Sequence, residues 1–199
     1  MGKVSFDRIS FLYDFIERFI LKDYQGSLDL MDKYLILKKS DDVIDVGSGT
    51  GFFSQSIVNN VSSVISVDPS KKMLLKNKNH DISNMQGNGT NLGIKDDSFD
   101  LALIINVIHH IQKEKQIDVI SEVYRLLKKQ GRIFIIEVFF PKTFWNKLFC
   151  FVEELLVGKT YHISAEKLES ELKKVGFLNV KMTYPKEHNW KYVAIGKKI

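Results

Sequence analysis

Apolar runs of strand length alternate with helical patterns along most of the chain. The runs that predict strands lie at residues 42–46, 62–67, 82–86, 100–105 and 131–137. The clearest amphipathic helix between them carries Ile117, Ile120, Val123 and Leu127, and we expect it to end at Gly131. Strands that alternate with helices indicate one α/β domain built on a parallel sheet.

The two ends of the chain follow other patterns. One face of a predicted N-terminal helix carries Phe6, Ile9, Tyr13, Ile16 and Ile20. A second, short helix is predicted around residues 28–35. Ser164 is typical of a helix N-cap, and the helix that it begins is expected to end before Gly176. The last apolar runs, 177–184 and 190–196, flank a turn-rich segment and predict a hairpin.

A glycine-rich turn follows the first predicted strand. It contains Gly47, Gly49 and Gly51, and the second predicted strand ends in the acid Asp68. This is the layout of a nucleotide-type ligand that lies across the carboxyl ends of parallel strands. Glycine lets the backbone come close to such a ligand, and the acid is placed to accept hydrogen bonds from two ribose hydroxyls. A glycine-rich turn without a ligand is the alternative.

The spacing of the glycines separates two cofactors. The dinucleotide pattern G-x-G-x-x-G requires a third glycine where this chain has Phe52. Asp45, just before the turn, would repel a diphosphate but suits a ligand that carries an ammonium group. S-adenosylmethionine has an ammonium group and a sulfonium and no phosphate, so the pattern favours it over NAD.

These residues resemble a known family. Residues 43–51 are similar to the first motif of the class I S-adenosylmethionine-dependent methyltransferases, and Asp68 is similar to their ribose-binding acid. Further motifs follow in the family's order: its G-D-A-x-x-L-P-F…D-x-S-F-D segment at 87–92 and 96–100, its post-strand loop at 106–111 and its R-x-L-K-P-G-G turn at 125–131. Residues 6–14 resemble the small-molecule branch that includes ubiquinone/menaquinone-biosynthesis and phospholipid methyltransferases.

The resemblance implies the fold and the reaction. The expected fold is a Rossmann-like, seven-stranded, mostly parallel α/β sheet with a C-terminal antiparallel hairpin and an N-terminal helical cap. We expect one methyltransferase domain over residues 1–199, with the cap over 1–38 and a lid or insertion over 138–162. The expected reaction is methyl transfer from S-adenosylmethionine, which leaves S-adenosylhomocysteine as the product.

The resemblance also implies roles at the cofactor. Gly47 and Gly49 would approach its amino-acid end, whose carboxylate can use amides at the next helix N-terminus. Asp45 would lie near the ammonium group, directly or through water. Asn88 stands where the family has an aspartate that receives the adenine amino group, and its side-chain carbonyl can still accept that bond.

The other expected cofactor-binding residues are Tyr13, Pro69, Met73, Gly89 and Asn106. Pro69 and Met73 would pack near the adenine, and Asn106 would expose its backbone carbonyl near the ammonium group. For Asn88 and Asn106, an ordinary turn residue is the alternative interpretation.

The segment 139–156 is apolar nearly all round, unlike an ordinary surface helix. Four interpretations are open: a lid over a lipophilic acceptor, a helix in peripheral contact with a membrane, a dimer contact, or a core helix packed on the N-terminal helices. In this family the region after the fifth strand commonly covers the acceptor. We expect a mainly apolar acceptor pocket built from the N-terminal helix and residues 139–162.

The sequence assigns no catalytic base. Methyl transfer is an in-line displacement with a good leaving group, so holding the reactants in line contributes much of the acceleration. A base matters when the acceptor is protonated, as in a phenol or hydroxyl. The candidates are His109, His110, Glu137, Tyr161 and His162. No metal site is expected.

Composition limits the partners and the compartment. The net charge of +5 comes almost wholly from lysine, and Arg8, Arg18, Arg125 and Arg132 form no cluster in the sequence. Arginine is favoured in base and phosphate recognition, so we expect a small-molecule or lipid-like acceptor and no nucleic acid. The single Cys150 indicates a reducing, cytoplasmic setting. A protein or RNA methyltransferase and a non-catalytic S-adenosylmethionine-binding module remain alternatives.

Overall fold

A computed structural model of the chain describes residues 13–139, 154 and 158–199, with side chains from residue 24 onward. These residues form a seven-stranded sheet of order β3-β2-β1-β4-β5-β7-β6. The strands are β1 (Asp42–Val46), β2 (Ser63–Asp68), β3 (Ile82–Gln86), β4 (Phe99–Ile105), β5 (Leu127–Val138), β6 (Leu178–Thr183) and β7 (Lys191–Lys197). The helices are α2 (Tyr13–Tyr34), α3 (Phe52–Ile57), η1 (Val58–Asn60), α4 (Lys71–Leu74), η2 (Ile108–His110), α5 (Lys113–Leu126) and α7 (Ala165–Val175).

The topology confirms the expected fold class. Strands β1 to β5 are parallel, whereas β7 is antiparallel to both β5 and β6. The predicted C-terminal hairpin is therefore present. The strand order reverses between β1 and β4, and ligands of open α/β sheets bind at the carboxyl ends of the strands beside such a switch point.

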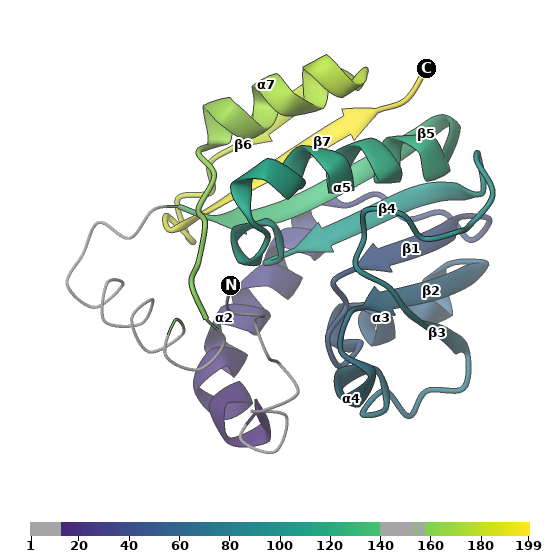
Figure 1. Ribbon diagram of the computed structural model, residues 1–199. Coiled ribbons are helices and arrows are strands. Elements are labelled where there is room, and N and C mark those ends of the chain that lie inside the picture. The colour runs from purple at the N-terminus through teal and green to yellow at the C-terminus, as the bar shows by residue number, and fades with distance from the viewer. Residues whose placement is uncertain (1–12, 140–153, 155–157) are drawn as a thin grey trace.

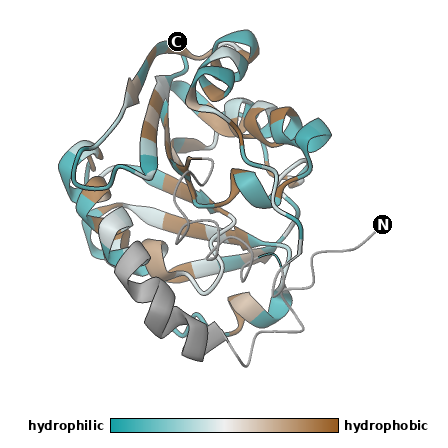
Figure 2. Ribbon diagram, turned by 90° about the vertical axis from the view of Figure 1, so that its left-hand side faces the viewer, coloured by the Kyte–Doolittle hydropathy of each residue, from teal (hydrophilic) through white to brown (hydrophobic). Residues whose placement is uncertain are grey.

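Helices cover both faces of the sheet (Figure 1). Leu101, Leu103 and Ile105 of β4 pack toward α2 and α3, and the alternate residues Ala102 and Ile104 pack toward α5 and α7. This burial on both faces explains why the central strands read as continuous apolar runs. Figure 2 shows the hydrophobic residues concentrated in the strands and the hydrophilic residues on the outer turns of the helices. None of the helices within the described ranges has the length and apolar character needed to span a bilayer.

Two predicted helix boundaries were wrong. Within the described residues, Tyr13–Tyr34 form one helix, α2, which continues through Gly26 where a break between two helices was expected. A Cβ at Gly26 would lie 2.9 Å from the His188 ring, so this glycine permits close packing and does not break the helix. Helix α5 ends at Leu126 and not at Gly131, because the chain passes directly into β5. Gln130 takes the left-handed conformation there, with φ of 67°.

The other predicted helix ends were correct. The Ser164 side chain accepts a hydrogen bond from the Lys167 amide and caps α7. Gly176, with φ of 118°, ends this helix in the left-handed conformation that favours glycine.

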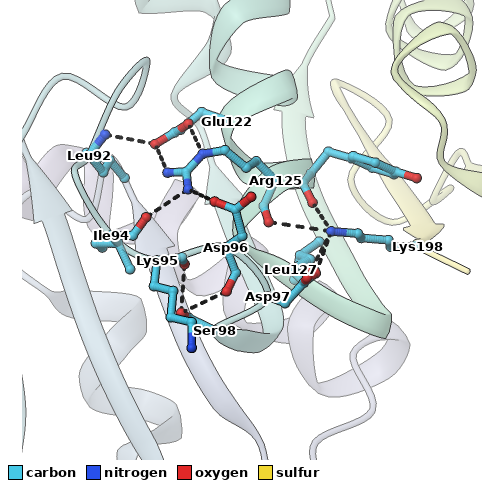
Figure 3. Close-up of polar contacts among 11 residues, drawn as sticks. Leu92, Ile94, Lys95, Asp96, Asp97, Ser98, Glu122, Arg125, Leu127 and Lys198 are labelled. Atoms are coloured by element: carbon cyan, nitrogen blue, oxygen red, sulfur yellow. Dashed lines mark hydrogen bonds and ion pairs between the residues drawn. The ribbon is translucent and has the colours of Figure 1, made fainter.

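A charge network closes the amino-terminal ends of β4 and β5 (Figure 3). The Arg125 guanidinium binds both oxygens of Glu122, at 2.9 and 2.7 Å, and also pairs with Asp96. Lys198 Nζ binds Asp97 at 2.8 Å and the Leu127 carbonyl at 2.7 Å. Asp96 therefore holds the loop before β4 onto α5, and Asp97 holds it to Lys198, at the edge opposite the carboxyl ends of the strands.

Candidate functional site

The glycine-rich turn lies at the carboxyl end of β1. Gly47, Gly49 and Gly51 all have positive φ, at 80°, 57° and 78°. A Cβ at Gly47 would lie 2.5 Å from Val107, which follows β4, whereas a Cβ at Gly49 would meet nothing within 4 Å. Among the described residues, the buried Ser48 Oγ has no hydrogen-bond partner. The turn therefore packs on one side and faces open space at Gly49, where a ligand can approach the backbone.

Asp68 ends β2 beside this open face. Its Oδ2 accepts a hydrogen bond from the Gly49 amide at 2.9 Å, and its Oδ1 accepts one from the Ser70 amide at 2.8 Å. An ionised carboxylate has about four acceptor positions, so both oxygens can serve the fold and a ligand together. The structure thus brings the predicted acid directly to the predicted turn.

Asp45 lies beneath the turn. Its side chain is 1% exposed and accepts a hydrogen bond from Ser54 Oγ of α3 at 2.6 Å. Ser54 Oγ is also 2.6 Å from Ser66 Oγ of β2. Burial, reinforced by the nearby charge of Asp68, raises the pKa of Asp45 to about 6. Asp45 therefore supports the turn from the core side. Its negative charge, when it is ionised, can attract a cationic group at the open face without direct contact.

The turn after β3 is the next neighbour of Asp68. The Gly87 amide donates to the Asp68 carbonyl at 3.1 Å. Asn88 is exposed, and its Oδ1 accepts hydrogen bonds from the Thr90 amide at 3.1 Å and from Thr90 Oγ1 at 2.9 Å. Gly89 follows with φ of 78°. The predicted residues Asn88 and Gly89 thus lie at the same edge as Asp68.

Two predicted adenine neighbours differ in exposure. Pro69 is exposed, and its carbonyl accepts a hydrogen bond from Gln86 Nε2 at 3.0 Å. Met73 is 2% exposed in α4, which Ser70 caps at the Met73 amide. Pro69 is therefore at the surface of the site, and Met73 supports it from the core.

The residue after β4 joins three elements. Asn106 has φ of 56°, and its amide donates to the Ile136 carbonyl at 2.9 Å. Its side chain lies 3.3 Å from Ser27 Oγ and 3.5 Å from Lys191 Nζ, and Lys191 donates to Ser27 at 2.6 Å. Ser27 and Lys191 are fully buried. Sequence reasoning missed both, because a lysine at a strand start carries no signal of burial.

The catalytic candidates meet at the ends of β4 and β5. His109 Nδ1 pairs with the carboxylate of Glu137, and both side chains are buried. The His109 ring stacks on His162 at 5.6 Å between centroids and lies 4.1 Å from the His110 ring. Burial alone would raise the pKa of Glu137, but the His109 imidazole outweighs it and brings that pKa below its ordinary value.

The backbone fixes this cluster. The Tyr161 amide donates to the His109 carbonyl at 2.6 Å. Gln116 Nε2 bridges the Ile108 carbonyl at 3.1 Å and the Tyr161 carbonyl at 2.8 Å. The segment that begins at residue 158 is therefore attached to the loop after β4, and all of the candidate bases lie in one neighbourhood.

Several predictions concern residues outside the described ranges. Tyr13 begins α2, but its side chain is not described, and residues 1–12 of the predicted cap are outside the described part. Of the segment 139–156, only Phe139 and Glu154 are described. The predicted lid over 138–162 and the apolar pocket that it would form therefore remain predictions.

Comparison with known proteins agrees with this architecture. Residues 44–135 match the family described as a methyltransferase domain. An uncharacterized protein of Methanocaldococcus jannaschii is 29% identical over 184 residues, covering 89% of this chain and 83% of the relative. A demethylmenaquinone methyltransferase of Lactobacillus johnsonii is 29% identical over 209 residues, covering 89% and 85%.

Solved structures share the fold. A methyltransferase complexed with the Haloferax volcanii activator Trm112 superposes with a TM-score of 0.79 at 14% identity and covers 99% of each chain. An S-adenosylmethionine-dependent methyltransferase of Archaeoglobus fulgidus gives a TM-score of 0.75 at 17% identity, covering 94% of this chain and 99% of its own. At these identities the likeness concerns the fold.

Proposed function

Because the chain belongs to the class I S-adenosylmethionine-dependent methyltransferases, we propose that it methylates a small, lipophilic acceptor at the carboxyl ends of β4 and β5. The observation that supports this acceptor class is the group of aromatic and imidazole rings at these strand ends. Phe139 stacks on Tyr184 at 5.9 Å and lies 5.0 Å from Tyr192. Phe139 comes two residues after Glu137, the partner of His109. Such a group of rings favours an apolar acceptor with a few polar groups.

We further propose that the cofactor lies on the glycine-rich turn and Asp68. The open space at Gly49 and the carboxylate beside it support this placement. When bound, S-adenosylmethionine supplies a methyl group on a positively charged sulfur. Asp68 would accept the ribose hydroxyls, and the Asn106 carbonyl and the charge of Asp45 would favour the ammonium group.

The cluster of imidazole side chains supplies groups that can accept a proton from the methyl acceptor. The carboxylate of Glu137 orients the buried His109 through Nδ1. His110 and His162 are half-buried and lie against His109. In this proposal the His109–Glu137 pair positions the loop, and His110 or His162 accepts the proton of an acceptor hydroxyl or phenol.

The acceptor is tested by supplying S-adenosylmethionine with a tritiated methyl group. A demethylated quinol, phospholipid head groups and bulk RNA are offered in parallel. We expect preferential, saturable labelling of the quinol, because the ring cluster favours an apolar ring and two curated relatives are named demethylmenaquinone methyltransferases. The control is the same assay with the protein inhibited by S-adenosylhomocysteine. Preferential labelling of RNA would overturn the proposed acceptor class.

The cofactor placement is tested by the substitution Asp68→Ala. We expect S-adenosylhomocysteine to bind about ten- to thirtyfold more weakly, because the change removes charged acceptors for two hydroxyls. Titration calorimetry measures this. Asp97→Ala, which removes an equal charge at the opposite edge of the sheet, should leave the affinity unchanged. Equal affinity of the Asp68 variant and the wild type would place the ribose elsewhere.

A further inference from the structure

The side chain of Asn88 has a fixed orientation. Its Oδ1 accepts two hydrogen bonds from Thr90, one from the amide and one from Oγ1. A carbonyl oxygen has two lone pairs, so both are used within the turn. The Thr90 amide is always a donor, and rotation of the Asn88 amide by 180° would place two donors against each other. Nδ2 is therefore the group that Asn88 presents outward, and it donates no hydrogen bond to any described residue.

The place of Asn88 in the sheet relates it to the cofactor base. Asp68 pairs in register with Gln86 at the end of β3, the edge strand. A nucleoside on Asp68 has the glycine-rich turn of β1 on one side and the Asn88 turn of β3 on the other. The turn of β1 takes the amino-acid end in the proposed site, so the base extends toward Asn88. This step rests on the proposed function.

We propose that Asn88 makes this site tolerant of the atom at C6 of the purine. Adenine carries an amino donor at C6, and a side chain that accepts from it selects for adenine. Asn88 instead presents a donor, which can serve N1 or N7 of adenine and equally the C6 oxygen of hypoxanthine. The chain therefore binds the 6-oxopurine form of the cofactor, in which inosine replaces adenosine, nearly as well as the adenosine form.

Binding of two nucleosides measures this tolerance. S-adenosylhomocysteine and S-inosylhomocysteine are titrated calorimetrically into the wild type and into Asn88→Asp. We expect the two affinities to lie within about threefold of each other in the wild type. Asn88→Asp should favour the adenosine form by about tenfold or more, because a carboxylate accepts from the amino group and repels the oxygen.

A matched control separates this effect from added charge. Asn84→Asp introduces the same negative charge on β3, the strand that precedes the Asn88 turn, and its carboxylate can still accept the 3.0 Å bond from Asn77 Nδ2. We expect its affinity ratio to match that of the wild type. Exclusion of the inosine form by the wild type by more than about thirtyfold, or an unchanged ratio in Asn88→Asp, would overturn the inference. Failure of both nucleosides to bind would instead overturn the proposed cofactor site, and the inference with it.

Discussion

Replacing Glu137 by alanine is expected to lower the free energy of unfolding by about 3 to 5 kcal/mol, the usual cost of breaking a buried ion pair from one side. Glu137 is 0% exposed, and its carboxylate accepts from His109 Nδ1, from the His109 amide at 3.2 Å and from the Val138 amide at 2.8 Å. All three donors lose their acceptor in the variant. Urea unfolding at neutral pH measures the loss.

Two further variants define the origin of this loss. Glu137→Gln keeps one acceptor oxygen and should lose a smaller amount, about 1 to 2 kcal/mol. Glu169→Ala removes an acid from an exposed pair with Lys173 and should change stability by less than about 0.5 kcal/mol. Wild-type stability in Glu137→Ala would show that the pair contributes nothing to the fold.

The pH dependence follows from the direction of the pKa shift. The pKa of Glu137 lies below its ordinary value of 4.5, so the folded chain releases this proton more readily than the unfolded chain. The contribution of Glu137 is therefore complete above pH 4.5 and is lost as the pH falls through the lower folded value. The difference in the free energy of unfolding between Glu137→Ala and the wild type should therefore become smaller as the pH falls below 4.5.

Local patterns predicted the parts of the site that lie close together in sequence. The turn at Gly47–Gly51 directly follows β1, and Asp68 directly ends β2, so strand periodicity alone places both at one edge. The pairing of Lys191 with Ser27 joins residues 164 positions apart, and that of His109 with Glu137 joins residues 28 apart. Such long-range pairs depend on the order of the strands in the sheet, and the hydrophobic periodicity of the sequence does not reveal that order.

A family motif can also mark a structural role. The 96–100 segment and Arg125 matched family motifs, yet the structure places Asp96 and Arg125 in the network at the opposite edge. Gln130 occupies the first glycine of the family's R-x-L-K-P-G-G turn and still adopts a positive φ. At Gln130 the family motif therefore reflects a positive-φ backbone conformation. The motif predicted neither the end of α5 nor the start of β5.

The substitution Asp45→Asn is expected to raise the stability of the ligand-free chain at pH 7.5 by at most about 3 kcal/mol, the free-energy equivalent of the raised pKa of Asp45. Burial raises the pKa of Asp45 from 3.8 to about 6, so the folded chain holds this proton more tightly than the unfolded chain. Between these two values the contribution of Asp45 to the stability of the wild type falls as the pH rises, and above pH 6 the folded chain bears the full cost of this buried charge. Asparagine keeps an oxygen that can accept from Ser54 and carries no charge.

Urea unfolding of both proteins at pH 4.0, 5.5 and 7.5 tests this. The gain in Asp45→Asn should be small at pH 4.0, intermediate at pH 5.5 and complete at pH 7.5, because the wild type is ionised only at the higher values. The same variant should bind S-adenosylhomocysteine more weakly at pH 7.5, since the proposed site uses this charge to favour the ammonium group. A gain that is equal at all three pH values would show that Asp45 is not the titrating group. A stability gain with a loss of affinity would identify Asp45 as a charge kept for binding at the expense of the fold.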